Sequence, residues 1–422
     1  MKIILKISLI VCVVLNSLYA EVADEKRDRV HSVRQVVDNI GKLEEKDISM
    51  VDSFKHMFTD GKISGQIRTI SIAYKQKELG VEDTYATAFG GILKYELAEF
   101  NGFNAGAAVY TSHDINFATG DGVKHNNELS SSAGDYTEMA EVYINYKYND
   151  FNLRVGRQLI DTPLADSDDI RMIQNTFNAY TLTYNFAGVD FMLGHLKSWQ
   201  GYDADLDTPW NKTGQDGTNL VGASYIDGLE FNLWYYNIAK NLNAFYIDTG
   251  FEYAFSDEYL LHLMAQYLHE SELDNSGIGA DIYGALVEFV AYDIGFNIAF
   301  NKSNKQEGKQ TFSGNGGGSM FTSMDTSIID DFANDRDVLA LVAGIVYSYN
   351  NFNFLYAYGD FNGDKNSVGQ KEHKVEQDVS IEYNVNDEFL VSAVYASVYD
   401  KEYSAKTQND WNRVQVMVNY NF

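Results

Sequence analysis

Apolar and polar residues alternate at every second position in most of the chain after Gly61. The last segment, Trp411 to Phe422, is the clearest case, because its even positions from Val414 onward are apolar or aromatic. The polar residues between them are Arg413, Gln415 and Asn419. Such alternation places the two sets on opposite faces of a β-strand. The segments at 229–235, 245–255, 259–267, 292–300 and 375–384 follow the same rule.

Very short polar turns alternate with long polar loops between these segments. The turns fall near residues 101, 149, 187, 227, 256, 291, 350 and 386, and the long loops are 113–135, 158–175, 200–216, 301–336 and 361–373. Counting segments gives about 18 strands, an even number as in bacterial outer-membrane barrels. We therefore predict an all-β fold over residues 61–422: a closed antiparallel transmembrane β-barrel, preceded by a short helical N-terminal segment.

A membrane location gives this pattern a physical reason. In hydrocarbon every backbone N–H and C=O must be paired, so a sheet can cross only if it closes on itself. About 18 strands enclose more space than side chains can fill, so the polar faces would line a wet lumen. A secreted soluble β-protein is the competing interpretation, but its turns would not alternate between short and long.

Composition narrows the function. The chain has 60 acidic and 32 basic residues, a formal net charge of −28, which argues against nucleic-acid binding. Its one cysteine, Cys12, lies in the N-terminal apolar stretch, so a mature chain would have no thiol for a disulfide, a thiolate metal site or a nucleophile. No elbow motif or local Ser/His pairing indicates a hydrolase, and we expect no enzyme activity.

The first 60 residues divide into two segments. Residues 1–20 read as a signal peptide, with Lys2 and Lys6 before an apolar stretch and a small residue, Ala20, at the expected cleavage site. In residues 21–60 apolar positions from Val30 to Ile40 recur every three or four residues, as on one helix stripe. We expect a partly helical periplasmic segment. A coiled-coil seam between subunits and a lumen plug are the alternatives.

One stretch carries a family resemblance. Leu153 to Gln158 (LRVGRQ) is followed by Asp161 to Leu164 (DTPL), Asp168 to Arg171 (DDIR) and Thr176-Phe177. This stretch, and the barrel region 61–422 as a whole, resembles the OprD-type porins, which include major outer-membrane porins of related Gram-negative bacteria. The resemblance implies 18 strands, a homotrimer or loose oligomer, and a narrow constriction made by the third loop, here 158–175, and often the seventh, here 301–336. It also implies uptake of amino acids, peptides and small carboxylates.

Charged residues in the third loop and on inward strand faces are the candidate pore lining. Four carboxylates fall within nine residues of that loop, and facing guanidiniums would create a transverse field across a constriction. Because carboxylates outnumber cations, we expect a mild cation preference. The predicted lining residues are Arg68, Arg154, Gln158, Asp161, Asp166, Asp168, Asp169, Arg171 and Arg413.

Two acidic groups could hold a cation, although solvated loop charges are the simpler interpretation of each. Asp166, Asp168 and Asp169 supply the carboxylate oxygens that Ca²⁺ prefers, without complete EF-hand spacing. A second group lies in the loop 301–336 and just beyond it: Asp325, Asp330, Asp331, Asp335 and Asp337. We expect no other metal and no cofactor.

These observations predict a porin that allows passive diffusion of small hydrophilic solutes and ions across a Gram-negative outer membrane. The alternative is a substrate-selective channel for amino acids or small carboxylates, and a structural or adhesive protein with a closed lumen is a third class. The expected partners are small solutes, outer-membrane lipid and lipopolysaccharide. The terminal Phe422, preceded by alternating apolar residues, is similar to the signal read by the barrel-assembly machinery. Both termini would be periplasmic.

Overall fold

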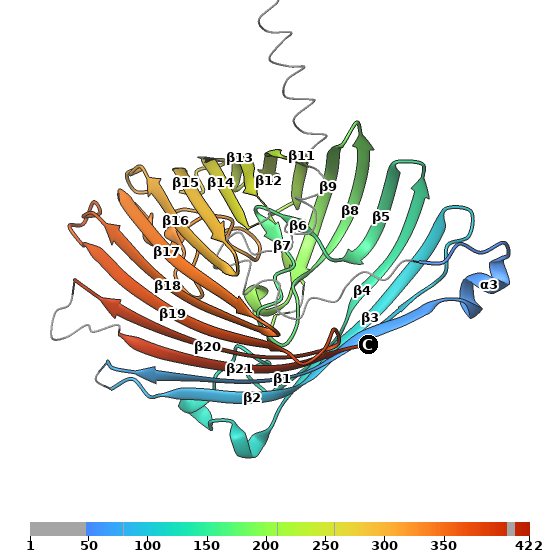
Figure 1. The fold of residues 1–422 in the computed structure, drawn as a ribbon, viewed down its shortest axis with the longest axis horizontal. Helices are drawn as coiled ribbons and strands as arrows, with labels where there is room; N and C mark the ends of the chain where they lie inside the picture. The colour runs from blue at the N-terminus through green and yellow to red at the C-terminus, as the bar shows by residue number, and fades with distance from the viewer. Residues whose placement is uncertain (1–47, 79, 209, 257, 403–409) are drawn as a thin grey trace, which may run out of the picture.

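The computed structural model describes residues 48–422 except 79, 209, 257 and 403–409. In this part of the chain one antiparallel sheet of 19 strands dominates (Figure 1). One of them is the two-residue β10 (Asn211–Lys212), which extends β9 only, so 18 strands form the wall. The predicted signal peptide at 1–20 and the predicted helix stripe from Val30 to Ile40 lie outside the described residues.

The wall strands follow one another around the barrel in chain order. They are β1 (Lys62–Gln76), β2 (Thr84–Glu96), β3 (Phe103–Asp114), β4 (Asp135–Tyr148), β5 (Phe151–Gln158), β8 (Thr176–Phe186), β9 (Val189–Gln200), β11 (Thr218–Asp227), β12 (Leu229–Ile238), β13 (Leu242–Ser256), β14 (Tyr259–Glu272), β15 (Ala280–Ala291), β16 (Ile294–Ser303), β17 (Val338–Tyr349), β18 (Phe352–Gly363), β19 (Glu372–Asn384), β20 (Phe389–Asp400) and β21 (Trp411–Asn421).

Smaller elements lie outside the wall. They are α3 (Phe54–Thr59), the 3₁₀ turns η1 (Asn116–Ala118), η2 (Gly122–Lys124) and η3 (Tyr202–Ala204), the hairpin β6 (Asp161–Thr162) and β7 (Ala165–Asp166), and α4 (Ile329–Phe332). None of the helices in the described residues has the length and apolar character needed to cross a membrane.

The barrel closes where the first strand meets the last. β1 pairs antiparallel with β21, with Gln66 opposite Asn421. The terminal Phe422 continues this ladder, because its N–H donates to the Gly65 carbonyl at 3.0 Å and its carbonyl accepts from the Gly65 N–H at 3.1 Å. Closure leaves no open sheet edge in the wall, as a lipid environment requires. The predicted closed antiparallel β-barrel of about 18 strands is confirmed.

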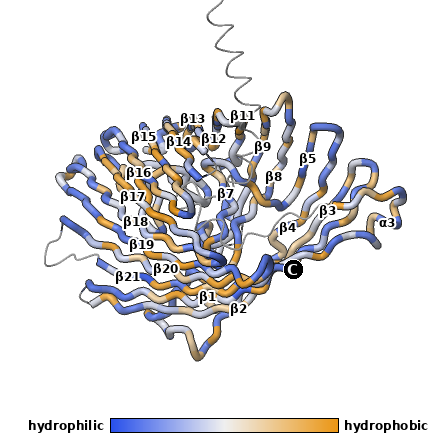
Figure 2. The backbone as a smooth tube through the Cα atoms, in the orientation of Figure 1, coloured by the Kyte–Doolittle hydropathy of each residue, from blue (hydrophilic) through white to orange (hydrophobic). Residues whose placement is uncertain are grey.

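The alternation predicted from the sequence separates the two faces of the wall. On β21, Val414 and Val416 are exposed on the outer face, whereas Arg413 and Gln415 are buried on the inner face. The same switch between hydrophobic and hydrophilic positions runs along the other strands (Figure 2). Apolar side chains therefore cover the lipid side, and polar side chains face the lumen, together with buried apolar residues such as Ile70 and Ile72 of β1.

Every connection at one rim of the barrel is short. β2 and β3 join through a turn whose central residues, Asn101 (φ 50°) and Gly102 (φ 83°), both have left-handed backbones, the geometry that suits a tight hairpin. The first residue of β1, Lys62, lies opposite Glu96 at the end of β2, so this turn shares a rim with the barrel's two ends. The long connections lie at the opposite rim, where the connection between β12 and β13 (239–241) is an exception with three residues.

Candidate functional site: a constriction inside the barrel

Two long connections fold into the barrel. Loop 3 (residues 159–175) joins β5 to β8 and contains the hairpin β6–β7, and loop 7 (residues 304–337) joins β16 to β17 and contains α4. They meet at a short parallel bridge between Ala165 and Asn315. The Asp166 N–H donates to the Asn315 carbonyl at 3.2 Å, and the Asn315 N–H donates to the Leu164 carbonyl at 3.0 Å. The two loops therefore form one continuous structure.

Arg68 of β1 anchors loop 3 to the wall. Its guanidinium makes two parallel bonds to the Asp169 carboxylate, Nη1 to Oδ1 at 2.6 Å and Nη2 to Oδ2 at 2.9 Å. The same Nη1 donates to the Arg171 carbonyl at 2.5 Å, and Nε donates to Asn419 Oδ1 at 2.9 Å. Both charged side chains are fully buried. A bidentate, buried pair of this kind fixes orientation as well as position.

Arg171 of loop 3 meets a carboxylate from another loop. Glu128 belongs to loop 2 (residues 115–134), and its Oε2 accepts from Arg171 Nε at 2.9 Å and lies 2.8 Å from Nη2. The Arg171 guanidinium also lies over the Tyr202 ring, 4.9 Å from its centroid. Burial disfavours both charges. The attraction between the two charges nevertheless outweighs the cost of burial. The pKa of Glu128 therefore lies below its usual range, and the pKa of Arg171 lies well above its usual range.

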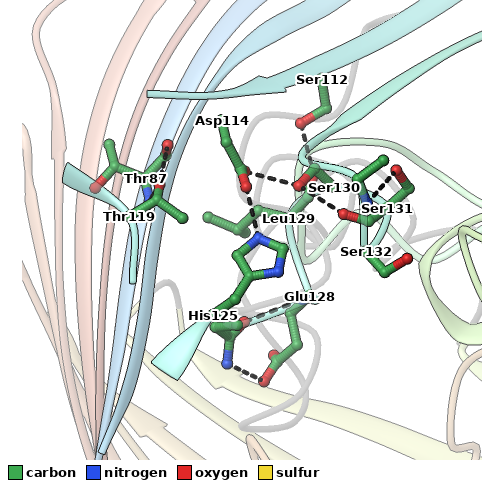
Figure 3. Close-up of polar contacts among 12 residues, drawn as sticks. Thr87, Ser112, Asp114, Thr119, His125, Glu128, Leu129, Ser130, Ser131 and Ser132 are labelled. Atoms are coloured by element: carbon green, nitrogen blue, oxygen red, sulfur yellow. Dashed lines mark hydrogen bonds and ion pairs between the residues drawn. The ribbon is translucent and has the colours of Figure 1, made fainter. Parts of the chain in front are cut away.

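Loop 2 is held in turn by the end of β3 (Figure 3). The Asp114 carboxylate bonds to His125 Nε2 at 2.6 Å through one oxygen and accepts from Ser130 Oγ at 2.7 Å through the other. Ser112 Oγ donates to the Leu129 carbonyl at 2.5 Å. These bonds lie on both sides of Glu128 in the chain. They therefore set the position from which Glu128 reaches Arg171.

Loop 7 contacts the wall on several strands. Asp325 forms an ion pair with Arg413 of β21, and both side chains are buried. On β19, Glu376 Oε1 accepts the Thr326 N–H at 2.9 Å and Asp378 Oδ2 accepts the Asp325 N–H at 3.1 Å. On β14, Gln266 Oε1 accepts the Phe321 N–H at 2.7 Å. Loop 7 therefore spans the lumen between distant strands.

A cavity of about 450 Å³ remains between these parts. Its charged lining comprises the carboxylates Asp168, Asp203, Asp325 and Asp331 and the guanidiniums Arg171 and Arg413. Its aromatic lining comprises Tyr74, Trp199, Tyr202 and Trp411. Among these described residues four carboxylates thus face two guanidiniums, so the cavity carries an excess of negative charge.

A family model described as "outer membrane porin, OprD family" matches residues 113–422 of the chain. The chain belongs to the OprD family of outer-membrane porins. Members of this family are channels. The predicted family and the predicted porin function are therefore confirmed, and the outer membrane is the location of the barrel. No curated protein sequence matches the chain.

Solved structures of porins share the fold at low sequence identity. Pseudomonas aeruginosa OpdK, determined with vanillate, is 18% identical with a TM-score of 0.73, over 86% of this chain and 99% of that one. Acinetobacter baumannii OccAB1 is 14% identical with a TM-score of 0.73, over 90% and 99%. A BenF-like porin from Pseudomonas fluorescens Pf-5 is 12% identical with a TM-score of 0.72, over 86% and 98%.

The structure brings three of the predicted lining residues of this OprD-family porin to the cavity: Asp168, Arg171 and Arg413. Arg68 and Asp169 bind one another where loop 3 meets the wall, and neither residue lines the cavity. The prediction placed arginines and carboxylates on opposite sides of the constriction. In the structure Arg68, Arg171 and Arg413 instead each form a direct ion pair with a carboxylate. Leaving such charges apart in a confined, poorly solvated space would be costly.

The other four predicted residues do not line the cavity, although Asp166 packs against Gly316 and Gly317, which do. Arg154 sits near the short-turn end of β5, where its Nε donates to Asn145 Oδ1 at 3.3 Å and its guanidinium lies over the Tyr143 ring. Gln158 is buried and bonds to Thr181 Oγ1 and the Ala179 carbonyl. Asp161 and Asp166 pair in register in the hairpin β6–β7, with Asp161 exposed.

The proposed Ca²⁺ ligands Asp166, Asp168 and Asp169 do not converge. Both oxygens of Asp169 accept hydrogen bonds from Arg68, so a guanidinium already balances the charge of this carboxylate. Within the described part of the chain, three carboxylates converge to within 4.8 Å at Asp325, Glu376 and Asp378 instead. Asp166, Asp168 and Asp169 are close in sequence, but neighbouring acidic residues in a loop need not point to one place.

Several residues of the constriction gave no usable sequence signal. Glu128 is one acidic residue in a polar loop of ordinary composition, and its partner Arg171 lies 43 positions away. Tyr202 and Trp199 were indistinguishable from the many other aromatic residues. Asp325 was visible only as one member of an acidic loop. The sequence shows an arginine and a loop with several aspartates, but it does not show which aspartate forms the ion pair.

Proposed function

We propose that this porin carries small hydrophilic solutes and ions through the cavity between loop 3 and loop 7, with a mild preference for cations. The observation that carries the proposal is the charge of the lining, four carboxylates against two guanidiniums. Confined between loops and wall, such a charge raises the local concentration of cations. The porin performs no covalent step in this mechanism.

A bilayer measurement tests the preference. Purified porin is inserted into a planar lipid bilayer with different KCl concentrations on the two sides, and the reversal potential is recorded. We expect a reversal potential whose sign shows that K⁺ is more permeant than Cl⁻. A reversal potential of the opposite sign, which means that Cl⁻ is more permeant, would refute the cation preference. Zero conductance would refute the open path and favour a structural or adhesive role.

The second candidate is selective uptake of small carboxylates, particularly aromatic ones. The observation that favours it is the combination of Arg171 and Arg413 with the aromatic side chains of Tyr74, Tyr202 and Trp411 in one cavity. Guanidiniums recognise carboxylates and aromatic rings offer stacking surfaces. OpdK, which shares the fold, was determined with vanillate, an aromatic carboxylate. Added vanillate should then block ion current saturably, whereas a general pore would show no saturation.

We further propose that the short-turn rim and both ends of the barrel face the periplasm, and that Phe422 is read during assembly. The hydrogen bonds of Phe422 to Gly65 complete the closing seam, which supports a role late in folding. We also propose contact of the long loops with lipopolysaccharide, and a homotrimer or looser oligomer as the family resemblance implies. Protease accessibility of the loops in whole cells and the native mass of the purified porin test these points.

A further inference from the structure

We propose that Asp325, Glu376 and Asp378 bind one Ca²⁺ ion between loop 7 and the barrel wall. Asp325 comes from loop 7, and Glu376 and Asp378 come from the inward face of β19, two positions apart. One oxygen from each carboxylate lies within 4.8 Å of the others, the spacing that a shared cation requires. All three donors are carboxylates, which a hard cation such as Ca²⁺ prefers.

The second observation is that two of these carboxylates each carry a buried oxygen with no partner. Glu376 and Asp378 are 0% and 1% exposed, and among the described residues no donor meets Glu376 Oε2 or Asp378 Oδ1 in good hydrogen-bond geometry, although the hydroxyls of Ser327 and Thr326 lie near Glu376. Their other oxygens are fixed by the backbone N–H groups of Thr326 and Asp325. Burying a carboxylate oxygen without a partner costs folding free energy unless a cation or a proton binds to it.

The cross-strand neighbours of Glu376 and Asp378 offer no compensating charge. The residues opposite Asp378 are Ala357 on β18 and Ala396 on β20. Those opposite Glu376 are Gly359 and Val398. These four are small or apolar, so none of them contributes a side-chain donor. The cationic side chain at the site is Arg413, which already contacts Asp325.

The charges therefore do not balance among the described residues of the site. When all three carboxylates are ionised, they and the one guanidinium carry a formal excess of two negative charges. One divalent cation cancels this excess. Asp325 also lines the cavity, which gives an ion in the lumen a route to the site. A bound Ca²⁺ would join loop 7 to β19 and stabilise the inward position of the loop.

The test measures Ca²⁺ binding by the folded, full-length porin in detergent. After treatment with a chelator and its removal, CaCl₂ is titrated in by calorimetry, with Asp378→Asn and Glu376→Gln compared with wild type. Asp331→Asn is the matched control, because it removes a loop 7 carboxylate that lines the same cavity but lies outside the group of three. Heat-modifiable migration on a gel shows that each variant is folded.

We expect saturable binding of one Ca²⁺ per wild-type chain, an affinity lower by at least about tenfold in Asp378→Asn and Glu376→Gln, and a clearly smaller decrease in Asp331→Asn, which removes a lining charge but no ligand. Absence of Ca²⁺ binding by wild type would overturn the proposal, as would equal weakening in all three variants, which would indicate diffuse attraction. Ion conductance measured on the same samples reports on the porin function separately, since the channel can conduct whether or not this site exists.

Discussion

Charged residues inside this barrel act mainly in pairs that hold the loops. Arg68 and Asp169 are both fully buried and bonded through two parallel contacts, and Arg413 contacts Asp325. A buried ion pair contributes little net stability over an apolar pair, but removal of one partner leaves a buried charge without compensation. Individual residues in the lumen therefore have structural effects that their charge alone does not predict.

Replacing Arg68 with methionine should lower the free energy of unfolding by about 3 kcal/mol, because the Asp169 carboxylate stays buried without its partner. Urea-induced unfolding of the porin in lipid vesicles measures the change. Asp161→Asn is the control, since Asp161 is exposed, and it should change stability by less than about 0.5 kcal/mol. Equal effects of the two substitutions would contradict the anchoring role of Arg68.

Glu128→Gln should make the porin less cation-selective at neutral pH, because Arg171 then lines the cavity without its counter-charge. The pKa of Glu128 is depressed in the folded protein: burial raises it, but Arg171 and Arg413 lower it further. The pair is therefore complete above the ordinary glutamate pKa of about 4.3 and is lost only as the pH falls through the lower folded value.

The reversal potentials of wild type and Glu128→Gln, measured between pH 7 and pH 3, should thus differ down to about pH 4.3 and converge only below it. Asp150→Asn, at an exposed short turn, serves as the control and should match wild type throughout. Convergence already near pH 6 would show that the Glu128 carboxylate is not held in its charged form.

At the scale of elements, the constriction depends on two loops whose backbones touch. Gly316 of loop 7 has φ +83°, and a Cβ there would lie 2.4 Å from the Asp166 carbonyl oxygen and 2.5 Å from Asn175 Nδ2. Glycine is thus required at this point for two reasons, the left-handed backbone and the close approach of loop 3. The loops can meet only because one of them lacks a side chain at the crossing.

Gly316→Ala should separate loop 7 from loop 3, destabilise the porin by at least about 1 kcal/mol and increase the single-channel current. Gly308→Ala is a matched control in the same loop, because Gly308 has φ +70° but no atom within 4 Å of its Cβ position. Planar-bilayer recordings and urea unfolding compare the two. A change in current that is the same in both variants would point to backbone strain rather than to the contact between loops.

At the scale of the whole molecule, the barrel is a closed wall around a lumen that loops 2, 3 and 7 fill in part. Loop 2 carries Glu128 to loop 3, and loop 3 and loop 7 join at the bridge between Ala165 and Asn315. The remaining cavity, about 450 Å³, collects most of its charge from loop residues. The wall therefore gives the porin its membrane location, and the loops give it its filter.

The selectivity of such a filter should depend on salt. The Debye length is about 10 Å at 0.1 M ionic strength and about 3 Å at 1 M, so concentrated salt screens the lining charges. At a fixed concentration ratio, the reversal potential should therefore fall toward zero as mean KCl rises from 0.1 M to 1 M. A selectivity that does not change with salt would indicate that size, rather than charge, sorts the solutes.

The sequence by itself determined the architecture of this protein. A period of two along each strand, short turns such as Asn101-Gly102 and the closing strand ending at Phe422 are local features, and each acts through neighbours a few residues away. They were sufficient to predict a closed membrane barrel of about 18 strands, and the stretch from Leu153 to Phe177 was sufficient to indicate the family.

The tertiary structure alone decided which charges meet. Arg68 and Asp169 are 101 positions apart, and Arg413 and Asp325 are 88 apart. Such contacts depend on where long loops settle in the lumen, which no local period encodes. For this reason three of the predicted lining residues, Asp168, Arg171 and Arg413, lie at the cavity, whereas Arg68 and Asp169 pair with one another away from it and Glu128 was not predicted. All inward-facing polar residues of a water-filled barrel follow the same sequence pattern. Only the packing of the loops decides which of them hold a loop in place and which line the cavity.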